Sequence, residues 1–473
     1  MTYLSHDNIM HNLSLFIFRR DFRVTDNTGL MKALIESKQV IPLFIFTPTQ
    51  VSDKNKYKSS NAIQFMIESL YDLDKKINKL WVAYDEELNI IAKLHKSYGL
   101  DAIYVNEDYT PYSIKRDSKI KNYCTKNDIT FDSSTDILLT DRLDITAKNG
   151  NYYHQFTMFY KNASKYPVRK PVRNNKSNFK PIKSKAWSIE SIDKFLSAND
   201  YYQINDAIAI HGGRKNALKI LGQVHKMKNY KNDKQYPMYP TTKLSAHLKF
   251  GNVSVREAYY IFRSEKSGEL VRGLYWRDFY YYVGVHFKKF FEYQYVGVQH
   301  DGQHQKWEHD KLHIRAWQTG QTGFPFVDAA MREMNTTGFM HNRGRLVASQ
   351  FLSKDLLVDW REGENYFSRT LVDIDRAQNT GNWNWSASYG MDNSPFLRIF
   401  NPWTQSATYD PECIYIKKWI PELEHIESKH IHNWFKYHEQ HLETNYPAPI
   451  VDHAQQRKKF IKYYTNYMKK IKG

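Results

Sequence analysis

Cysteine and long apolar runs are scarce in this 473-residue chain. Only Cys124 and Cys413 are present, too few for a disulfide framework or for an iron–sulfur cluster with four thiolate ligands. No run of about 18 apolar residues occurs, and the N-terminus lacks a charged segment followed by an apolar one. We therefore expect a soluble cytoplasmic protein without a bound metal or membrane anchor, close to the nucleoid if the source is a prokaryote.

Acidic residues are also in deficit: 50 Asp and Glu stand against 68 Lys and Arg, which leaves a formal net charge of +18. A surface of that charge attracts polyanions, either nucleic acid or an anionic membrane. Aromatic residues are abundant at 15%, with 35 Tyr and 11 Trp. A codon bias that favours Lys, Asn and Tyr accounts for most of the tyrosines, but it explains the tryptophans less well.

The first part of the chain alternates apolar runs with amphipathic stretches. Four short runs are typical of buried parallel strands: Leu13–Phe18, Val40–Phe46, Leu80–Tyr84 and Ala102–Val105. Between them, two stretches have the apolar spacing of helices: Asn61–Leu80 and Glu86–Tyr98. This pattern predicts an α/β domain with a doubly wound parallel sheet over residues 10–140.

Beyond this domain the composition changes twice. Residues 161–185 are rich in Lys and Arg and contain no acidic residue, which predicts an exposed basic linker over residues 141–195. From about residue 196 the strand-like runs disappear, and helix starts are indicated at Ser254 and Asp328. We predict a larger all-α domain over residues 196–473.

A group of hydroxyl side chains follows Pro240. Residues Thr241–Ser245 precede an apolar helical stretch, and a helix N-terminus with free N–H groups is a potential phosphate site. Ser and Thr also cap helices that bind no ligand, so this motif alone indicates only a helix start.

Tryptophans in the C-terminal half stand in segments too polar for an ordinary core. Indole oxidises more readily than aliphatic side chains and stacks at van der Waals distance, so a row of them can pass electrons. The polar segments that carry or adjoin them are Thr337–Leu346, Asp359–Arg361, Asp373–Trp385 and Phe396–Pro402.

These motifs resemble those of the photolyase/cryptochrome flavoproteins, most closely the microbial class I cyclobutane pyrimidine dimer photolyases. The resemblance extends from Phe18–Arg23 to Tyr446–Val451. It implies an α/β antenna domain, a larger all-α domain that binds FAD, UV-damaged DNA as the partner, and a monomer. A second antenna chromophore, a folate, a deazaflavin or a flavin, stays open because the folate-type acidic contact near Asn106–Ser113 is not reproduced in register.

The resemblance also implies three groups of site residues. Contacts with FAD are expected from Tyr230, Thr241, Thr242, Lys243, Leu244, Ser245, Arg345, Asp373, Asp375 and Asn379. Asn379 at flavin N5 favours a two-electron-reduced, repair-competent cofactor. Electrons are expected to reach the flavin through Trp307, Trp360 and Trp383. Contacts with the flipped-out lesion are expected from Trp276, Arg277, Asn342, Arg343, Leu346, Trp385 and Arg398.

The chain departs from the family pattern at Gly273, where class I dimer photolyases usually carry a Glu that contacts the lesion. We do not expect Glu269, one helical turn earlier, to cover the same place, because helical side chains lean towards the N-terminus. Light-driven repair of cyclobutane pyrimidine dimers is the favoured function, and a cryptochrome-type photoreceptor without repair is the alternative. Repair of (6-4) photoproducts is disfavoured, because that group uses His where this chain has Asn342 and Leu346.

Overall fold

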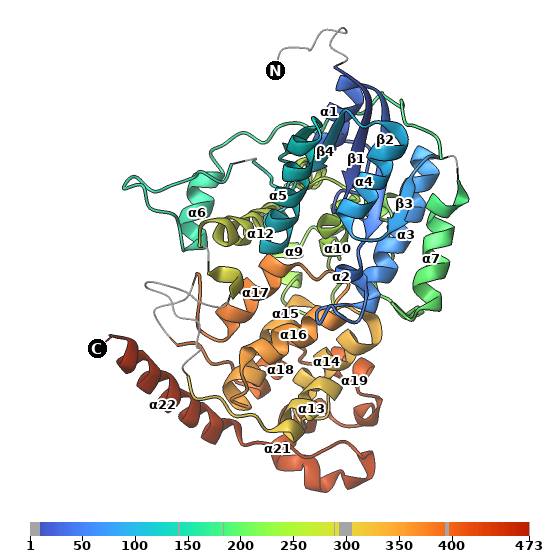
Figure 1. The fold of residues 1–473 in the computed structure, drawn as a ribbon. Helices are drawn as coiled ribbons and strands as arrows, with labels where there is room; N and C mark the ends of the chain where they lie inside the picture. Colours follow the sequence, from blue (N-terminus) through green and yellow to red (C-terminus); the bar gives the residue numbers. More distant parts are fainter. Residues whose placement is uncertain are drawn as a thin grey trace.

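The computed structural model describes residues 10–140, 142–182, 184–287, 289–292, 305–392 and 397–472. A parallel sheet with its helices forms one end of the molecule, and the helices of the C-terminal half form the other (Figure 1). Within the described ranges, no helix has both the length and the apolar character that crossing a membrane requires.

The sheet has five parallel strands in the order β3-β2-β1-β4-β5. The strands are β1 (His11–Phe18), β2 (Ser37–Phe46), β3 (Trp81–Tyr84), β4 (Ala102–Asn106) and β5 (Thr130–Ser134). The predicted α/β class and the four predicted strands are confirmed. Sequence inspection misses β5, because this edge strand reads Thr-Phe-Asp-Ser-Ser and is only partly buried, so it carries no apolar run.

Alternate residues of β1 face two different cores. Phe16 and Phe18 pack in one core with α1 and α3, whereas Leu15 and Ile17 pack in the other with α4 and α5. The helices of this part are α1 (Thr28–Glu36), α2 (Pro48–Val51), α3 (Ser60–Ile77), α4 (Glu87–Tyr98) and α5 (Pro111–Lys126). The two helices predicted from apolar spacing correspond to α3 and α4.

The basic segment after α6 (Phe156–Ala163) lies against the sheet domain. Backbone hydrogen bonds join Val40 to Asn178 (3.0 Å) and Lys180 to Val40 (2.8 Å), beside the edge of β2. Arg169 forms an ion pair with buried Asp26 at 2.6 Å. Two kinds of contact therefore hold this segment on the first domain, although it has the composition of a linker.

Helices make up the rest, and the described residues after 182 contain no strand. The helices are α7 (Ile189–Ala198), α8 (Arg214–Gly222), α9 (Tyr230–Asp233), α10 (Ser245–Lys249), α11 (Val255–Ser264), α12 (Gly268–His286), α13 (Lys311–Thr319), α14 (Pro325–Thr337), α15 (Asn342–Gln350), α16 (Trp360–Thr370), α17 (Arg376–Ser386), α18 (Pro402–Tyr409), α19 (Ile414–Trp419), α20 (Ser428–His432), α21 (Trp434–Tyr437) and α22 (His453–Lys472). One turn of π-helix, Phe351–Asp355, follows α15.

The two predicted helix starts have different outcomes. Ser254 caps α11 in a capping box, in which its hydroxyl accepts the Glu257 N–H and the Glu257 carboxylate accepts the Ser254 N–H. The start predicted at Asp328 is wrong, because α14 begins three residues earlier at Pro325, a residue well suited to the first helical position. The Asp328 carboxylate instead accepts the N–H groups of the preceding loop.

Candidate cofactor and substrate site

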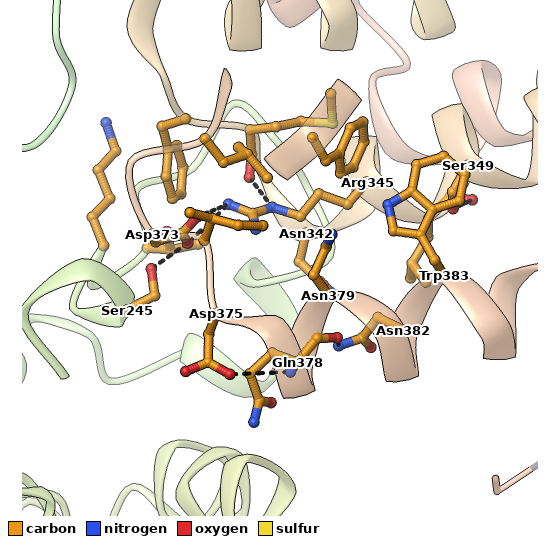
Figure 2. Close-up of a pocket in the computed structure, with 18 of the residues that line it drawn as sticks. Ser245, Asn342, Arg345, Ser349, Asp373, Asp375, Gln378, Asn379, Asn382 and Trp383 are labelled. Carbon is orange, nitrogen blue, oxygen red and sulfur yellow. Dashed lines mark hydrogen bonds and ion pairs between the residues drawn. The ribbon is translucent and has the colours of Figure 1, made fainter. Parts of the chain in front are cut away.

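A cavity of ≈ 310 Å³ lies among α10, α15, α16 and α17 (Figure 2). The structure brings together in its wall every residue expected to contact FAD: Tyr230, Thr241, Thr242, Lys243, Leu244, Ser245, Arg345, Asp373, Asp375 and Asn379. A second cavity shares part of this wall and continues to α12. The two adjoining spaces suit an elongated dinucleotide better than a compact ligand.

Asp373 organises one side of the first cavity. Its carboxylate accepts hydrogen bonds from the Ser245 hydroxyl at 2.6 Å and from the Arg345 guanidinium at 2.9 and 3.0 Å (Figure 2). Arg345 also donates to the carbonyl oxygen of Met340 at 2.9 Å. These bonds fix a cation in the cavity wall, where it can balance negative charge on a bound ring system.

Asp375 connects the cavity with the sheet domain. It caps α17 by accepting the Gln378 N–H, and it binds Arg20, which follows β1, and the Tyr281 hydroxyl. Burial alone would raise the pKa of Asp375, but the charge of Arg20 and the bond from Tyr281 lower it below its ordinary value. The carboxylate is therefore ionised at neutral pH.

Asn379 projects from the first turn of α17 into the cavity. Its amide nitrogen donates to the Glu364 carbonyl oxygen and to the Ser368 hydroxyl, both at 3.0 Å. Both donor hydrogens are thereby used inside the protein. The side-chain oxygen is left as the atom that can accept a hydrogen bond from a ligand N–H.

The three expected electron carriers differ in burial. Trp383 lines the cavity, and Trp360 is fully buried in the hydrophobic core to which Trp383 also belongs. Trp307 is partly buried and packs against that core. Gly363 allows α16 to approach α17, because a Cβ atom there would lie 2.1 Å from the Trp383 ring. Sequence reasoning missed buried Trp317, whose ring centroid lies 6.1 Å from that of Trp383. Its position in an amphipathic helix offered no signal beyond an ordinary core residue.

A further cavity of ≈ 430 Å³ lies beside the first. Its wall contains Trp276, Arg277, Asn342, Leu346 and Trp385, which were all expected to contact the lesion. The two cavities share six residues: Tyr230, Thr241, Asn342, Leu346, Gln378 and Asn382. Below we call this cavity of ≈ 430 Å³ the lesion cavity.

The Trp276 ring is held in place by a neighbouring aromatic ring. Its ring stacks on Phe156 of α6 at 3.6 Å with an interplanar angle of 9°. The Trp385 indole N–H donates to the carbonyl oxygen of Asp392 at 3.2 Å, which fixes the second indole. Two oriented aromatic side chains thus belong to the wall of one cavity.

Two expected lesion contacts lie elsewhere. Arg343 is only 8% exposed, with its guanidinium 3.8 Å from the Tyr409 ring centroid and hydrogen-bonded to Gln405 and Gln235. Arg398 is exposed and lines neither cavity. Helix α15 therefore directs Asn342 and Leu346 to the lesion cavity, whereas the Arg343 side chain is buried against Tyr409.

Glu269 and Gly273 lie one helical turn apart on the same face of α12. Glu269 lines the lesion cavity together with Gly273, and both residues also line the cavity that adjoins it on the flavin side. No heavy atom lies within 4 Å of the place a Gly273 Cβ would occupy, so the Glu269 side chain does not fill that place. Lys234 and Arg272 lie in the same wall, and no motif in the sequence pointed to either residue.

A fourth cavity of ≈ 360 Å³ lies between the carboxyl ends of the strands and the helical part. Arg19 and Arg20 after β1, Asp108 after β4, and Lys249 of α10 are in its wall. Burial lowers the pKa of Lys249 to about 7. Ligands of doubly wound sheets bind at this edge.

Two family models match the chain. Residues 270–466 match the family model of the FAD binding domain of DNA photolyase, and residues 14–175 match that of DNA photolyase. The deoxyribodipyrimidine photo-lyase of Alkalihalophilus pseudofirmus is 33% identical over 94% of this chain and 96% of its own length. That of Escherichia coli is 31% identical over 93% and 96%.

Solved structures extend the likeness to the fold. A Sulfolobus tokodaii photolyase with two FAD molecules is 38% identical, with a TM-score of 0.85 over 96% of this chain and all of that one. A Synechocystis cryptochrome is 25% identical, also with a TM-score of 0.85, over 96% of this chain and 99% of that one. With its FAD-binding domain, its five-stranded sheet domain and full-length relatives, the chain belongs to the DNA photolyase family.

Proposed function

We propose that this protein is a deoxyribodipyrimidine photo-lyase, which uses light to reopen cyclobutane pyrimidine dimers in DNA. The observation that supports this most directly is the wall shared by the cofactor cavity and the lesion cavity. Asn342 and Leu346 face both spaces, so a base in one lies about one side chain from a ring in the other. Electron transfer requires such proximity. FAD held by Ser245, Arg345, Asp373 and Asn379 would supply the light-driven electron to the dimer and would accept it back.

The residues of the cofactor cavity would bind and tune FAD. Ser245 and Arg345 converge on Asp373, which leaves a fixed cation beside the ring. A preorganised charge stabilises negative charge on a cofactor without reorganising during the reaction. Asn379 offers its side-chain oxygen to a cofactor N–H, an arrangement that favours the reduced form. These roles support repair rather than signalling.

The residues of the lesion cavity would receive the dimer after it leaves the duplex. Flipping costs a few kcal/mol of lost stacking, which aromatic platforms in the protein offset. Trp276, backed by Phe156, and Trp385 are suited to this task because their rings are already oriented. The net charge of +18 adds sequence-independent attraction to the DNA backbone.

For the cavity between the sheet and the helices we propose an antenna chromophore, a second flavin nucleotide. The Sulfolobus tokodaii photolyase, 38% identical to this chain, holds two FAD molecules. Arg19, Arg20 and Lys249 make this wall basic, and a bound phosphate would restore full charge to Lys249. Acid extraction of the purified protein should release about two flavins per chain. A stable ratio of one after reconstitution with excess flavin would contradict a flavin antenna.

A cryptochrome-type photoreceptor without repair is the competing function. The missing Glu at position 273 and the Synechocystis cryptochrome fold support it. The deciding experiment mixes the photoreduced protein with an oligonucleotide that contains a thymine dimer and follows thymine absorbance under blue light. Recovery of absorbance in the light but not in the dark supports repair. No recovery, together with equal affinities for damaged and undamaged DNA, would establish the photoreceptor instead.

A further inference from the structure

Two side chains of opposite charge stand together in the wall of the lesion cavity. Lys234, directly after α9, and Glu269, in the first turn of α12, form an ion pair with 2.5 Å between Nζ and Oε2. Their side chains are 29% and 30% exposed, so the pair is accessible to a ligand while it remains partly screened from water.

The geometry of α12 presents this pair to the cavity. Gly273 follows Glu269 by one helical turn, and its missing Cβ leaves empty space in the wall. The hydrogen bond from Lys234 is the largest cause of the lowered pKa of Glu269. Near neutral pH the wall therefore offers an ammonium donor directly beside a carboxylate acceptor.

The other charged side chains of this wall are engaged with protein groups. The Arg272 guanidinium lies over the Phe156 and Tyr160 rings at 4.8 and 5.2 Å, and Arg277 donates to the carbonyl oxygen of Ile137 at 2.7 Å. Asp392 accepts the Phe156 N–H at 2.8 Å. Lys234 and Glu269 are bound to each other instead, and they can exchange that contact for one with a ligand.

A neighbouring donor and acceptor match the edge of a pyrimidine. Thymine carries an N3–H donor between two carbonyl acceptors, and formation of the cyclobutane ring at C5 and C6 leaves that edge unchanged. Building on the repair function proposed above, we propose that the Lys234–Glu269 pair reads the Watson–Crick edge of the flipped-out pyrimidine. The Glu269 carboxylate accepts N3–H, and the Lys234 ammonium donates to the adjacent carbonyl oxygen.

Glu269→Ala provides a test in which the sign of the effect is diagnostic. Loss of a hydrogen bond to a charged group should weaken binding to a thymine-dimer oligonucleotide by about tenfold or more. A carboxylate that only repels DNA would give the opposite result, because its removal should strengthen binding to damaged and undamaged DNA alike. Flavin content is measured in parallel, and its loss would overturn the proposal by assigning the pair to cofactor binding.

Glu422→Ala is the matched control. Glu422 forms an ion pair with Arg332 at 2.9 Å, its side chain is also 30% exposed, and it lines none of the four cavities described above. Its replacement should leave the affinity for dimer-containing DNA within about twofold, the range expected for a surface pair.

A substrate change completes the test, and its first comparison needs only the wild-type protein. A dimer methylated at N3 cannot donate, so wild-type protein should bind it about tenfold more weakly, and Glu269→Ala should lose nothing further. Equal binding of both substrates by wild-type protein, or equal losses in wild type and variant, would overturn the proposal. If wild-type protein repairs the unmodified dimer, those results refute the pair alone, whereas absence of repair refutes the proposed function.

Discussion

Gly363 is a position at which a single added methyl group should disturb the cofactor cavity. A methyl group at this position of α16 would lie 2.1 Å from Trp383 Cη2 and 2.6 Å from Leu352 Cδ2. Carbon atoms in contact prefer about 3.5–4.0 Å, so at least one of these buried neighbours must move by more than about 1 Å. Trp383 also lines the cavity, and a displaced indole would narrow it.

The magnitude follows from two opposing terms. Replacing Gly by Ala within a helix stabilises the fold by about 1 kcal/mol, whereas overpacking a dense core costs about 1–3 kcal/mol or more. At 2.1 Å the upper part of that range applies, so we expect Gly363→Ala to lose about 2 kcal/mol of folding free energy and to bind flavin more weakly. Gly273→Ala is the matched control, because its Cβ meets no atom within 4 Å. This variant should gain up to about 1 kcal/mol.

Thermal unfolding followed by flavin fluorescence measures both effects, because release of the cofactor marks loss of its cavity. The expected order of midpoints is Gly273→Ala above wild type and wild type above Gly363→Ala. A Gly363→Ala protein that keeps the wild-type midpoint and full flavin content would refute the reasoning, since it would show that α16 and α17 separate without cost.

Three further predictions concern the same region. Trp307→Phe should slow light-driven reduction of the oxidised protein with an external donor, while repair by chemically reduced protein persists; an unchanged photoreduction rate would show that another residue replaces Trp307. Arg345→Met should leave the Asp373 carboxylate without its cation and lower flavin affinity at least tenfold, measured by equilibrium dialysis, and full retention of flavin would contradict the role of this ion pair. Burial, and then the charge of nearby Arg345, lower the pKa of His341 in the folded protein to about 4, from about 6.5 in the unfolded chain. As the pH falls, the unfolded chain therefore binds this proton at a higher pH than the folded protein does. The contribution of His341 to the free energy of unfolding is fully present above pH about 6.5. It decreases by about 3 kcal/mol as the pH falls to about 4. His341→Asn should flatten that part of the curve in acid titrations of unfolding, and an unchanged slope would contradict the assignment.

The pattern of apolar residues was sufficient to predict the sheet domain and the helical domain after it. Buried strands such as β1 and β4 consist of apolar runs because helices cover both faces of the sheet. Strand β5 was not predictable, since an edge strand with a polar sequence has no such run. The start of α14 was misplaced because the Asp328 carboxylate caps the preceding loop rather than the helix.

Residue identity also determined which side chains could form a flavin-type site, since Ser245, Arg345, Asp373 and Asn379 carry the donors, acceptors and charges it needs. Their convergence depended on the packing of α10, α15 and α17, which brings residues 128 positions apart in sequence to 2.6 Å between Ser245 and Asp373. Tertiary structure alone decided that Asn342 lines the lesion cavity whereas the neighbouring Arg343 packs on Tyr409. It also decided that Lys234 forms an ion pair with Glu269, one helical turn from the empty position at Gly273. Local sequence sets the periodicity and chemistry of each element, but contacts between distant elements depend on how whole helices pack, and packing is a property of the complete chain.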